Sequence, residues 1–111
     1  MSLSTHVLDT GLGEPAPGVP VRLERLHEAG MGSAGGWIEL AAGLTDDDGR
    51  LRDWVPEDEW HAGTYRLVFD TAARSVFFPE VSVVFFVAEP SRHHHVPLLL
   101  SPYGYSTYRG S

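Results

Sequence analysis

Histidine and arginine side chains gather in the last part of the sequence. Residues 93–95 are three consecutive histidines, half of the six in the chain, and Arg109 follows near the end. The chain contains fifteen Asp and Glu residues, yet none of them lies after Glu89. Imidazole groups exchange protons near neutral pH and bind metals, and a guanidinium group is a permanently charged fork of donors. This region therefore has the residue types for acid–base chemistry, for metal binding or for holding a polar ligand.

The three histidines cannot all act together if they lie on a strand. Side chains at positions i and i+2 of a strand share a face, so His93 and His95 point to one side and His94 to the other. A metal site needs two or three convergent imidazoles, so a third ligand would have to come from elsewhere in the chain. A histidine in a strand is also commonly an ordinary core or surface residue. The sequence leaves both interpretations open.

Four further residues have side chains suited to a polar site. His6 lies in the first predicted strand, Arg50 directly follows a turn, and Tyr108 and Arg109 lie near the end. Taken singly, each has a structural interpretation: a histidine in a strand, a solvated charge after a turn, and two residues of a frayed terminus. They form a site only if the fold brings them together with His95.

The elements that must position these residues are predicted to be strands. Alternating apolar and polar residues predict strands over 3–9, 19–27, 37–44, 51–54, 64–70, 81–87, 93–100 and 105–108. The aspartates and glycine of residues 45–49 predict a tight turn that places Arg50. Residues 29–36 are expected to form a mobile loop, and only residues 71–75 favour a helix. Seven or eight strands at intervals of about ten residues predict an antiparallel β-sandwich or barrel.

Composition and length narrow the class of protein. A chain of 111 residues without an internal repeat predicts one domain over residues 1–111. A formal net charge of −7 argues against nucleic-acid binding, which requires a basic surface. The absence of cysteine rules out disulfides and thiolate metal sites. The N-terminal residues do not resemble a signal peptide and no apolar run is long enough to span a membrane, so a cytoplasmic protein is expected.

Several motifs spread over nearly the whole chain resemble the 5-hydroxyisourate hydrolases, the transthyretin-like enzymes of purine breakdown. The motifs occupy residues 3–10, 13–16, 45–50, 77–81, 95–102 and 108–111, together with Val19, Val21 and Leu23. The tetrapeptide at 108–111 is the most specific of them. In this family it separates the hydrolases from transthyretin itself, the hormone carrier.

This resemblance implies a fold and an assembly. The fold is an all-β, transthyretin-like sandwich of two antiparallel sheets with one short helix after the strand over 64–70. The assembly is a homotetramer with active sites at a subunit interface, and the substrate is a small purine-derived molecule. No cofactor, metal, nucleic acid or membrane is implied.

The resemblance also assigns residues to the site. Catalytic roles carry over to His6, Arg50 and His95, and substrate binding carries over to Tyr108, Arg109, Gly110 and Ser111. One position departs from the pattern, because His94 stands where the family commonly has tyrosine. Since His94 faces away from His95 by strand alternation, we expect this change to affect packing or an interface and not the chemistry.

The implied reaction is the hydrolysis of 5-hydroxyisourate to 2-oxo-4-hydroxy-4-carboxy-5-ureidoimidazoline. His6 and His95 would form a pair in which one histidine is the base for water and the other orients it, and the sequence does not say which is which. Arg50 would polarise the carbonyl and hold the ring. The alternative is a transthyretin-like carrier of small molecules without catalysis, which would favour apolar or small residues at the positions of these polar ones.

Overall fold

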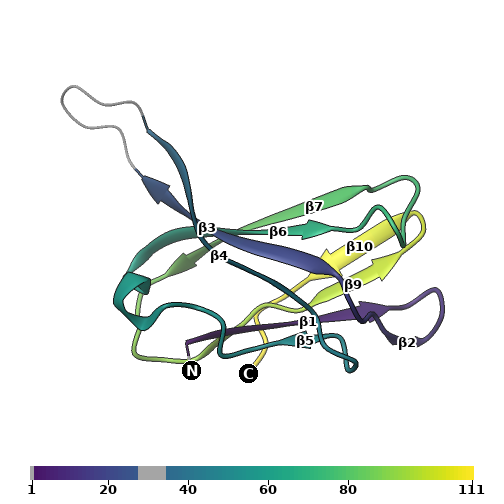
Figure 1. Ribbon diagram of the computed structural model, residues 1–111, viewed down its shortest axis with the longest axis horizontal. Helices are drawn as coiled ribbons and strands as arrows, with labels where there is room; N and C mark the ends of the chain where they lie inside the picture. Colours follow the sequence, from purple (N-terminus) through teal and green to yellow (C-terminus); the bar gives the residue numbers. More distant parts are fainter. Residues whose placement is uncertain (1, 28–34) are drawn as a thin grey trace.

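The computed structural model describes residues 2–27 and 35–111, which form two β-sheets packed face to face (Figure 1). The strands of this part of the chain are β1 (Leu3–Asp9), β2 (Glu14–Pro15), β3 (Pro20–His27), β4 (Gly36–Leu44), β5 (Arg50–Leu51), β6 (Gly63–Asp70), β7 (Glu80–Val87), β8 (His94–His95), β9 (Leu98–Ser101) and β10 (Gly104–Thr107). A single turn of 3-10 helix, η1 (Glu57–Glu59), lies between β5 and β6. Residues 28–34, which include most of the loop expected over 29–36, lie outside the described residues.

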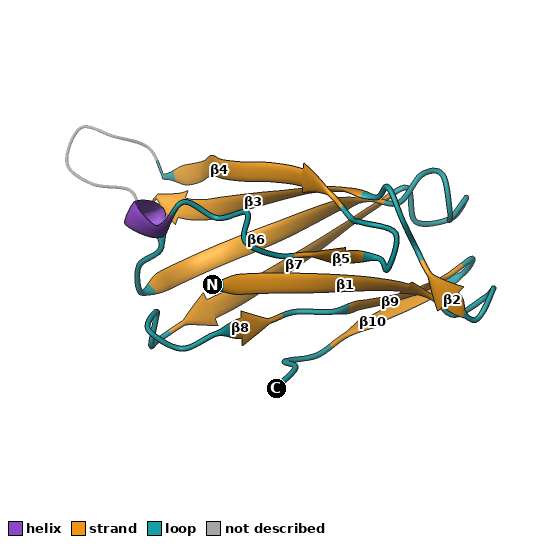
Figure 2. Ribbon diagram, turned by 60° about the horizontal axis from the view of Figure 1, so that its bottom comes forward, coloured by secondary structure: helices purple, strands orange, loops and turns teal. Residues whose placement is uncertain are grey.

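Strand β1 is the centre of the first sheet. The strand order of this sheet is β10-β9-β1-β2, and β5 and β8 also pair with β1. The pairing is antiparallel with β2 and β5 and parallel with β8 and β9, so β1 lies between these two pairs of strands (Figure 2). One strand therefore collects segments from the start, the middle and the end of the chain.

The second sheet is a regular antiparallel sheet in the order β4-β3-β6-β7. Its long strands alternate apolar and polar residues, and Val21 and Leu23 of β3 are buried beside Leu67 and Phe69 of β6. This alternation presents one apolar face to the first sheet, which is the arrangement that buries the most apolar area in a two-layer β-fold.

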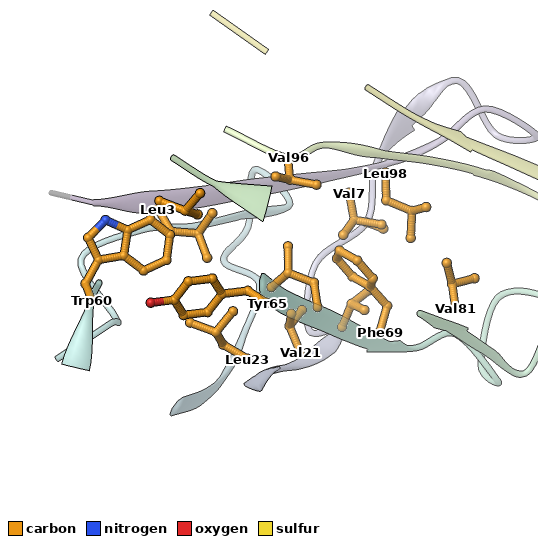
Figure 3. Packing of buried hydrophobic residues seen from close by; sticks show 14 residues of the cluster. Leu3, Val7, Val21, Leu23, Trp60, Tyr65, Phe69, Val81, Val96 and Leu98 are labelled. Carbon is orange, nitrogen blue, oxygen red and sulfur yellow. The ribbon is translucent and has the colours of Figure 1, made fainter. Parts of the chain in front are cut away.

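The core lies between the two sheets (Figure 3). Leu3 and Val7 of β1 are buried there together with Tyr65 and Phe69 of β6. Burying each such side chain contributes about 1.5–3 kcal/mol. Because side chains alternate along β1, this anchoring of Leu3 and Val7 turns Ser4 and His6 to the opposite, outer face of the sheet.

The expected two-sheet sandwich is confirmed, with three differences in its details. Ten strands are present among the described residues, where seven or eight were expected, because several are only two residues long. The predicted strand over 93–100 is divided into β8 and β9 at Val96–Pro97, since proline has no N–H for a ladder. The pairing of these two strands with β1 is parallel, not antiparallel.

The prediction of a helix over residues 71–75 is wrong. This segment is a single hydrogen-bonded turn, in which the N–H groups of Arg74 and Ser75 donate to the carbonyl of Thr71. The hydroxyl of Ser75 then accepts from the N–H of Phe78 and donates to the carbonyl of Pro102. These side-chain bonds compete with a continuing helix and tie the segment to the β9–β10 turn. No helix of the described residues is long and apolar enough to cross a membrane.

Candidate active site

The register of β1 brings three of the predicted site residues onto one face. His6 is paired directly with Arg50 of β5, and Ser4 is paired directly with His95 of β8. Side chains of directly paired residues project to the same side of a sheet, and Ser4 and His6 share a face of β1. His6, Arg50, His95 and Ser4 therefore lie together on the outer face of the first sheet, away from the core.

A tight turn places Arg50. The Asp46 side chain accepts hydrogen bonds from the N–H groups of Asp48 (2.9 Å) and Arg50 (3.0 Å), and these bonds lower the pKa of Asp46. Gly49 has a φ of 74°, and a Cβ atom there would lie 2.4 Å from the carbonyl oxygen of Val7. Only glycine fits this close approach of the turn to β1. The turn is therefore locked onto the strand that carries His6.

The tautomer of His6 follows from its hydrogen bond. His6 Nε2 lies 2.8 Å from the carbonyl oxygen of Asp48, in the turn that precedes Arg50. A carbonyl oxygen only accepts, so Nε2 carries the hydrogen. In the neutral ring Nδ1 is then the nitrogen with a lone pair, which can accept a hydrogen bond from a substrate or from water.

His95 is held from two sides. Its Nδ1 lies 2.8 Å from the Ser4 hydroxyl, and its carbonyl accepts a hydrogen bond of 2.8 Å from the N–H of Gly110. Partial burial, together with the nearby His6, Arg50 and His93, lowers the pKa of His95 below the usual histidine value. His95 is therefore neutral at neutral pH, and its Nε2 is the nitrogen left for chemistry.

Ser4, Arg50 and His95 border a small polar cavity, and His6 is not among the residues that line it. It has a volume of about 220 Å³ and is lined by Ser4, Thr5, Arg50, Arg52, His93, His95 and Ser111. Two guanidinium groups and two imidazoles face a space with few apolar side chains. Such a cavity suits a flat, polar or anionic molecule that accepts hydrogen bonds.

The four residues 108–111 are not all in this cavity. Ser111 lines it, and Gly110 packs against the His95 ring, so that a Cβ atom on Gly110 would lie 2.4 Å from His95 Cδ2. Arg109 lies in an adjoining hollow with Arg92 and His93. Tyr108 lines a different hollow beside β7 and β8. Within one chain, the predicted substrate-binding set thus divides between the cavity and its surroundings.

His93 and His94 separate as strand alternation predicts. His93 Nε2 lies 2.9 Å from the Ser4 hydroxyl on the outer face. His94 is 5% exposed, donates from Nδ1 to the carbonyl of Arg92 and meets the Trp60 ring edge-on on the inner side. Among the described residues no group of three or more His, Asp or Glu side chains is arranged to hold a metal ion.

Two cavity residues of the outer face were missed in the sequence. Ser4 bridges two histidines, and Arg52 adds a second cation beside Arg50. Ser4 lies two residues before His6, and Arg52 lies two residues after Arg50. The same alternation that selected His95 over His94 would have placed both of them on the site face.

Comparison with known proteins gives a consistent result. A profile of the HIUase/Transthyretin family matches residues 3–110. The 5-hydroxyisourate hydrolase of Salmonella dublin is 46% identical over 115 residues, which cover 98% of this chain and 80% of that protein. The structure of Klebsiella pneumoniae 5-hydroxyisourate hydrolase superposes with a TM-score of 0.76 at 35% identity, covering 100% of both chains. Sea bream transthyretin in complex with thyroxine superposes with a TM-score of 0.85 at 32% identity, covering 99% of this chain and 95% of that one.

Proposed function

The chain belongs to the HIUase/Transthyretin family, and from this premise we propose that it is a 5-hydroxyisourate hydrolase of urate degradation. The product is 2-oxo-4-hydroxy-4-carboxy-5-ureidoimidazoline. One observation carries the proposal: the register of β1 sets His6 opposite Arg50 and Ser4 opposite His95, so that the polar cavity is assembled on one face. The similarity of this chain to the hydrolase of Salmonella dublin supports the same activity.

The reaction adds water across a ring amide bond. The water oxygen bonds to the carbonyl carbon, the ring C–N bond breaks, and the products are a carboxylate and a ureido N–H. The step requires a base for the water and a donor for the oxyanion that forms on the carbonyl oxygen. A positioned base contributes about 10²–10⁴ in rate, and a positioned oxyanion donor contributes about 10²–10³.

His95 is the base in this proposal. Its lowered pKa keeps the ring neutral at neutral pH, and Nε2 takes the proton of the attacking water and then gives it to the leaving ring nitrogen. The Nε2–H of His6 is committed to the carbonyl of Asp48, so His6 orients the water through Nδ1. Arg50 donates to the developing oxyanion and holds the flat ring with its planar fork.

The substrate-binding residues complete the cavity when subunits assemble. Ligand cavities commonly have volumes of about 300–1,000 Å³, and the cavity of one chain is smaller than this range. We propose that a homotetramer brings the outer faces of two first sheets together, so that Tyr108 and Arg109 join Gly110 and Ser111 around the substrate. Sedimentation equilibrium tests the tetramer, and a monomeric active protein would contradict it.

The alternative function is a carrier of a small aromatic molecule. It is favoured by one observation, the close superposition on sea bream transthyretin in complex with thyroxine. A channel for an apolar ligand requires apolar or small side chains, whereas this face carries His6, Arg50 and His95. The polar face therefore favours the hydrolase.

Two measurements separate these functions. The first follows the ultraviolet absorbance of freshly generated 5-hydroxyisourate against its spontaneous decay. The second titrates thyroxine into the purified protein. Acceleration of the decay, lost in His95→Asn, supports the hydrolase. Tight thyroxine binding with no acceleration would establish the carrier and refute the hydrolase.

A further inference from the structure

We propose that Ser4 is a positioning residue, whose hydroxyl links His93 and His95 in one hydrogen-bonded chain and holds His95 in the Nδ1–H form. In that form Nε2 has the lone pair that a base needs. This inference rests on the proposed function, because it concerns how the base of that reaction is kept ready. It adds a residue, Ser4, and gives His93 a role as the second hydrogen-bond partner of the Ser4 hydroxyl.

The geometry of the chain is set by two adjacent strands. The Ser4 Oγ atom lies 2.8 Å from His95 Nδ1 and 2.9 Å from His93 Nε2. Ser4 is 9% exposed, and its hydroxyl is hydrogen-bonded to both imidazoles. Its backbone carbonyl also accepts from the N–H of Val96, which keeps Ser4 beside His95.

Counting protons leaves two possible directions for the hydrogen-bonded chain through Ser4. A hydroxyl has one hydrogen, so Ser4 donates to one imidazole and accepts from the other. In one arrangement His95 Nδ1–H donates to Ser4, and Ser4 donates to His93 Nε2. In the reverse arrangement Ser4 donates to His95 Nδ1, the neutral His95 ring carries its hydrogen on Nε2, and it is not a base there.

The charges around the cavity favour the first arrangement. Arg50 and Arg52 line the cavity, and guanidinium groups only donate hydrogen bonds. A lone pair on Nε2 is stabilised by the positive charge of the arginines in the same cavity, whereas an Nε2–H would meet like partial charges. The hydrogen of His95 is therefore driven to Nδ1, where Ser4 accepts it. The Ser4 hydroxyl as acceptor and the two arginines as donors together fix the tautomer of His95.

The first test measures the tautomer in the wild-type protein. Imidazole ¹⁵N shifts, with His95 assigned by comparison with His95→Asn, distinguish a hydrogen on Nδ1 from one on Nε2. We expect Nδ1–H above the pKa of His95 in the unliganded protein. Finding the Nε2–H form would overturn the inference without reference to any variant.

The second test removes the hydroxyl. Ser4→Ala is expected to lower kcat by about tenfold with KM within about twofold, because a base in mixed tautomers loses part of its rate advantage. Its ¹⁵N spectrum should show His95 in both forms. Ser4→Thr keeps a hydroxyl and should recover most of kcat, since threonine is well tolerated in strands. Ser82→Ala, at an exposed position of β7, is the matched control and should behave as wild type.

The outcomes separate this inference from the proposed function. A wild-type protein that does not accelerate 5-hydroxyisourate decay refutes the function, while the tautomer measurement still tests the chain. Suppose that the wild-type protein is active, and that Ser4→Ala folds, retains Nδ1–H on His95 and keeps full kcat. This result refutes the role of the Ser4 hydroxyl and leaves the proposed function in place. If Ser4→Ala does not fold, the wild-type spectrum and Ser4→Thr decide the question.

Discussion

The backbone of Gly110 packs closely against the imidazole ring of His95. The N–H of Gly110 donates to the His95 carbonyl at 2.8 Å, and a Cβ atom at 110 would lie 2.4 Å from His95 Cδ2 and 3.1 Å from Cγ. A glycine in the terminal segment therefore forms one wall for the imidazole, while Ser4 holds the ring from its Nδ1 side. This contact gives the segment over 108–111 a role that does not require its side chains.

We expect Gly110→Ala to lower kcat/KM by about tenfold or more, since a small misplacement of a catalytic group is costly. The added methyl must displace either the imidazole or the terminal segment. The control is Gly104→Ala, where the new Cβ would lie 3.4 Å from Ser101 Oγ, an ordinary contact. Equal kcat/KM in the two variants would show that the contact with His95 has no catalytic consequence.

Gly49→Ala should destabilise the fold and also reduce activity. Alanine at a φ of 74° costs about 1–2 kcal/mol in backbone strain, and the clash with the Val7 carbonyl adds to this cost. Gly18→Ala has a similar φ of 71° with nothing within 4 Å, so it measures the strain alone. Urea unfolding should show a larger loss for Gly49→Ala. Equal losses would mean that the turn moves freely away from β1.

The acid limb of the pH–activity profile should have its midpoint at a pH below the usual pKa of histidine. His95 must be neutral to accept a proton, so kcat/KM rises with pH through its pKa and then levels off. Burial comes first among the causes that lower this pKa, followed by His6, Arg50 and His93. We expect the midpoint in kcat/KM below about 6.5. A midpoint at or above that value would argue against His95 as the base.

Arg50→Ala should lower kcat/KM by about 10²–10³ through loss of the oxyanion donor. It should also move the acid limb upward, because removing a nearby cation lets the pKa of His95 rise. Arg50→Lys is the matched variant, since it keeps the charge and loses the planar fork. We expect it to leave the acid limb near its wild-type position while kcat/KM stays low. An unchanged acid limb in Arg50→Ala would contradict the electrostatic coupling.

His94→Phe and His95→Phe test the two faces of one short strand. His94→Phe loses the hydrogen bond to the Arg92 carbonyl, which should cost about 1 kcal/mol of stability while kcat/KM stays near wild type. His95→Phe should lower kcat/KM by about 10²–10⁴ through loss of the base. Urea unfolding and the absorbance assay measure both quantities. Strong loss of activity in His94→Phe would overturn the assignment of faces.

Local patterns predicted the elements and their faces well. Alternation placed β1, β3, β4, β6 and β7 close to their observed bounds and put His93 and His95 on the face opposite to His94. The turn over 45–49 was recognised from its aspartates and its glycine. These predictions succeed because side-chain alternation and turn chemistry depend on only a few neighbouring residues.

Local patterns failed where distant segments compete for the same groups. Residues 71–75 favoured a helix, but the Ser75 hydroxyl donates a hydrogen bond to the carbonyl of Pro102 in another turn. Trp60 follows the 3-10 turn η1 and lies in no predicted strand, yet it is 6% exposed and donates from its indole to the carbonyl of Pro90. In both cases a partner about thirty residues away decides the conformation.

The sequence by itself determined the candidates, because residue types and the family resemblance named His6, Arg50 and His95, and strand alternation separated His95 from His94. Only the tertiary structure decided that they meet, because the register of β1 with β5 and β8 depends on the core packing of Leu3 and Val7. The Ser4–His95 hydrogen bond spans 91 residues of sequence. No local propensity specifies a pairing at that separation, since it is chosen by burial of the whole inner face.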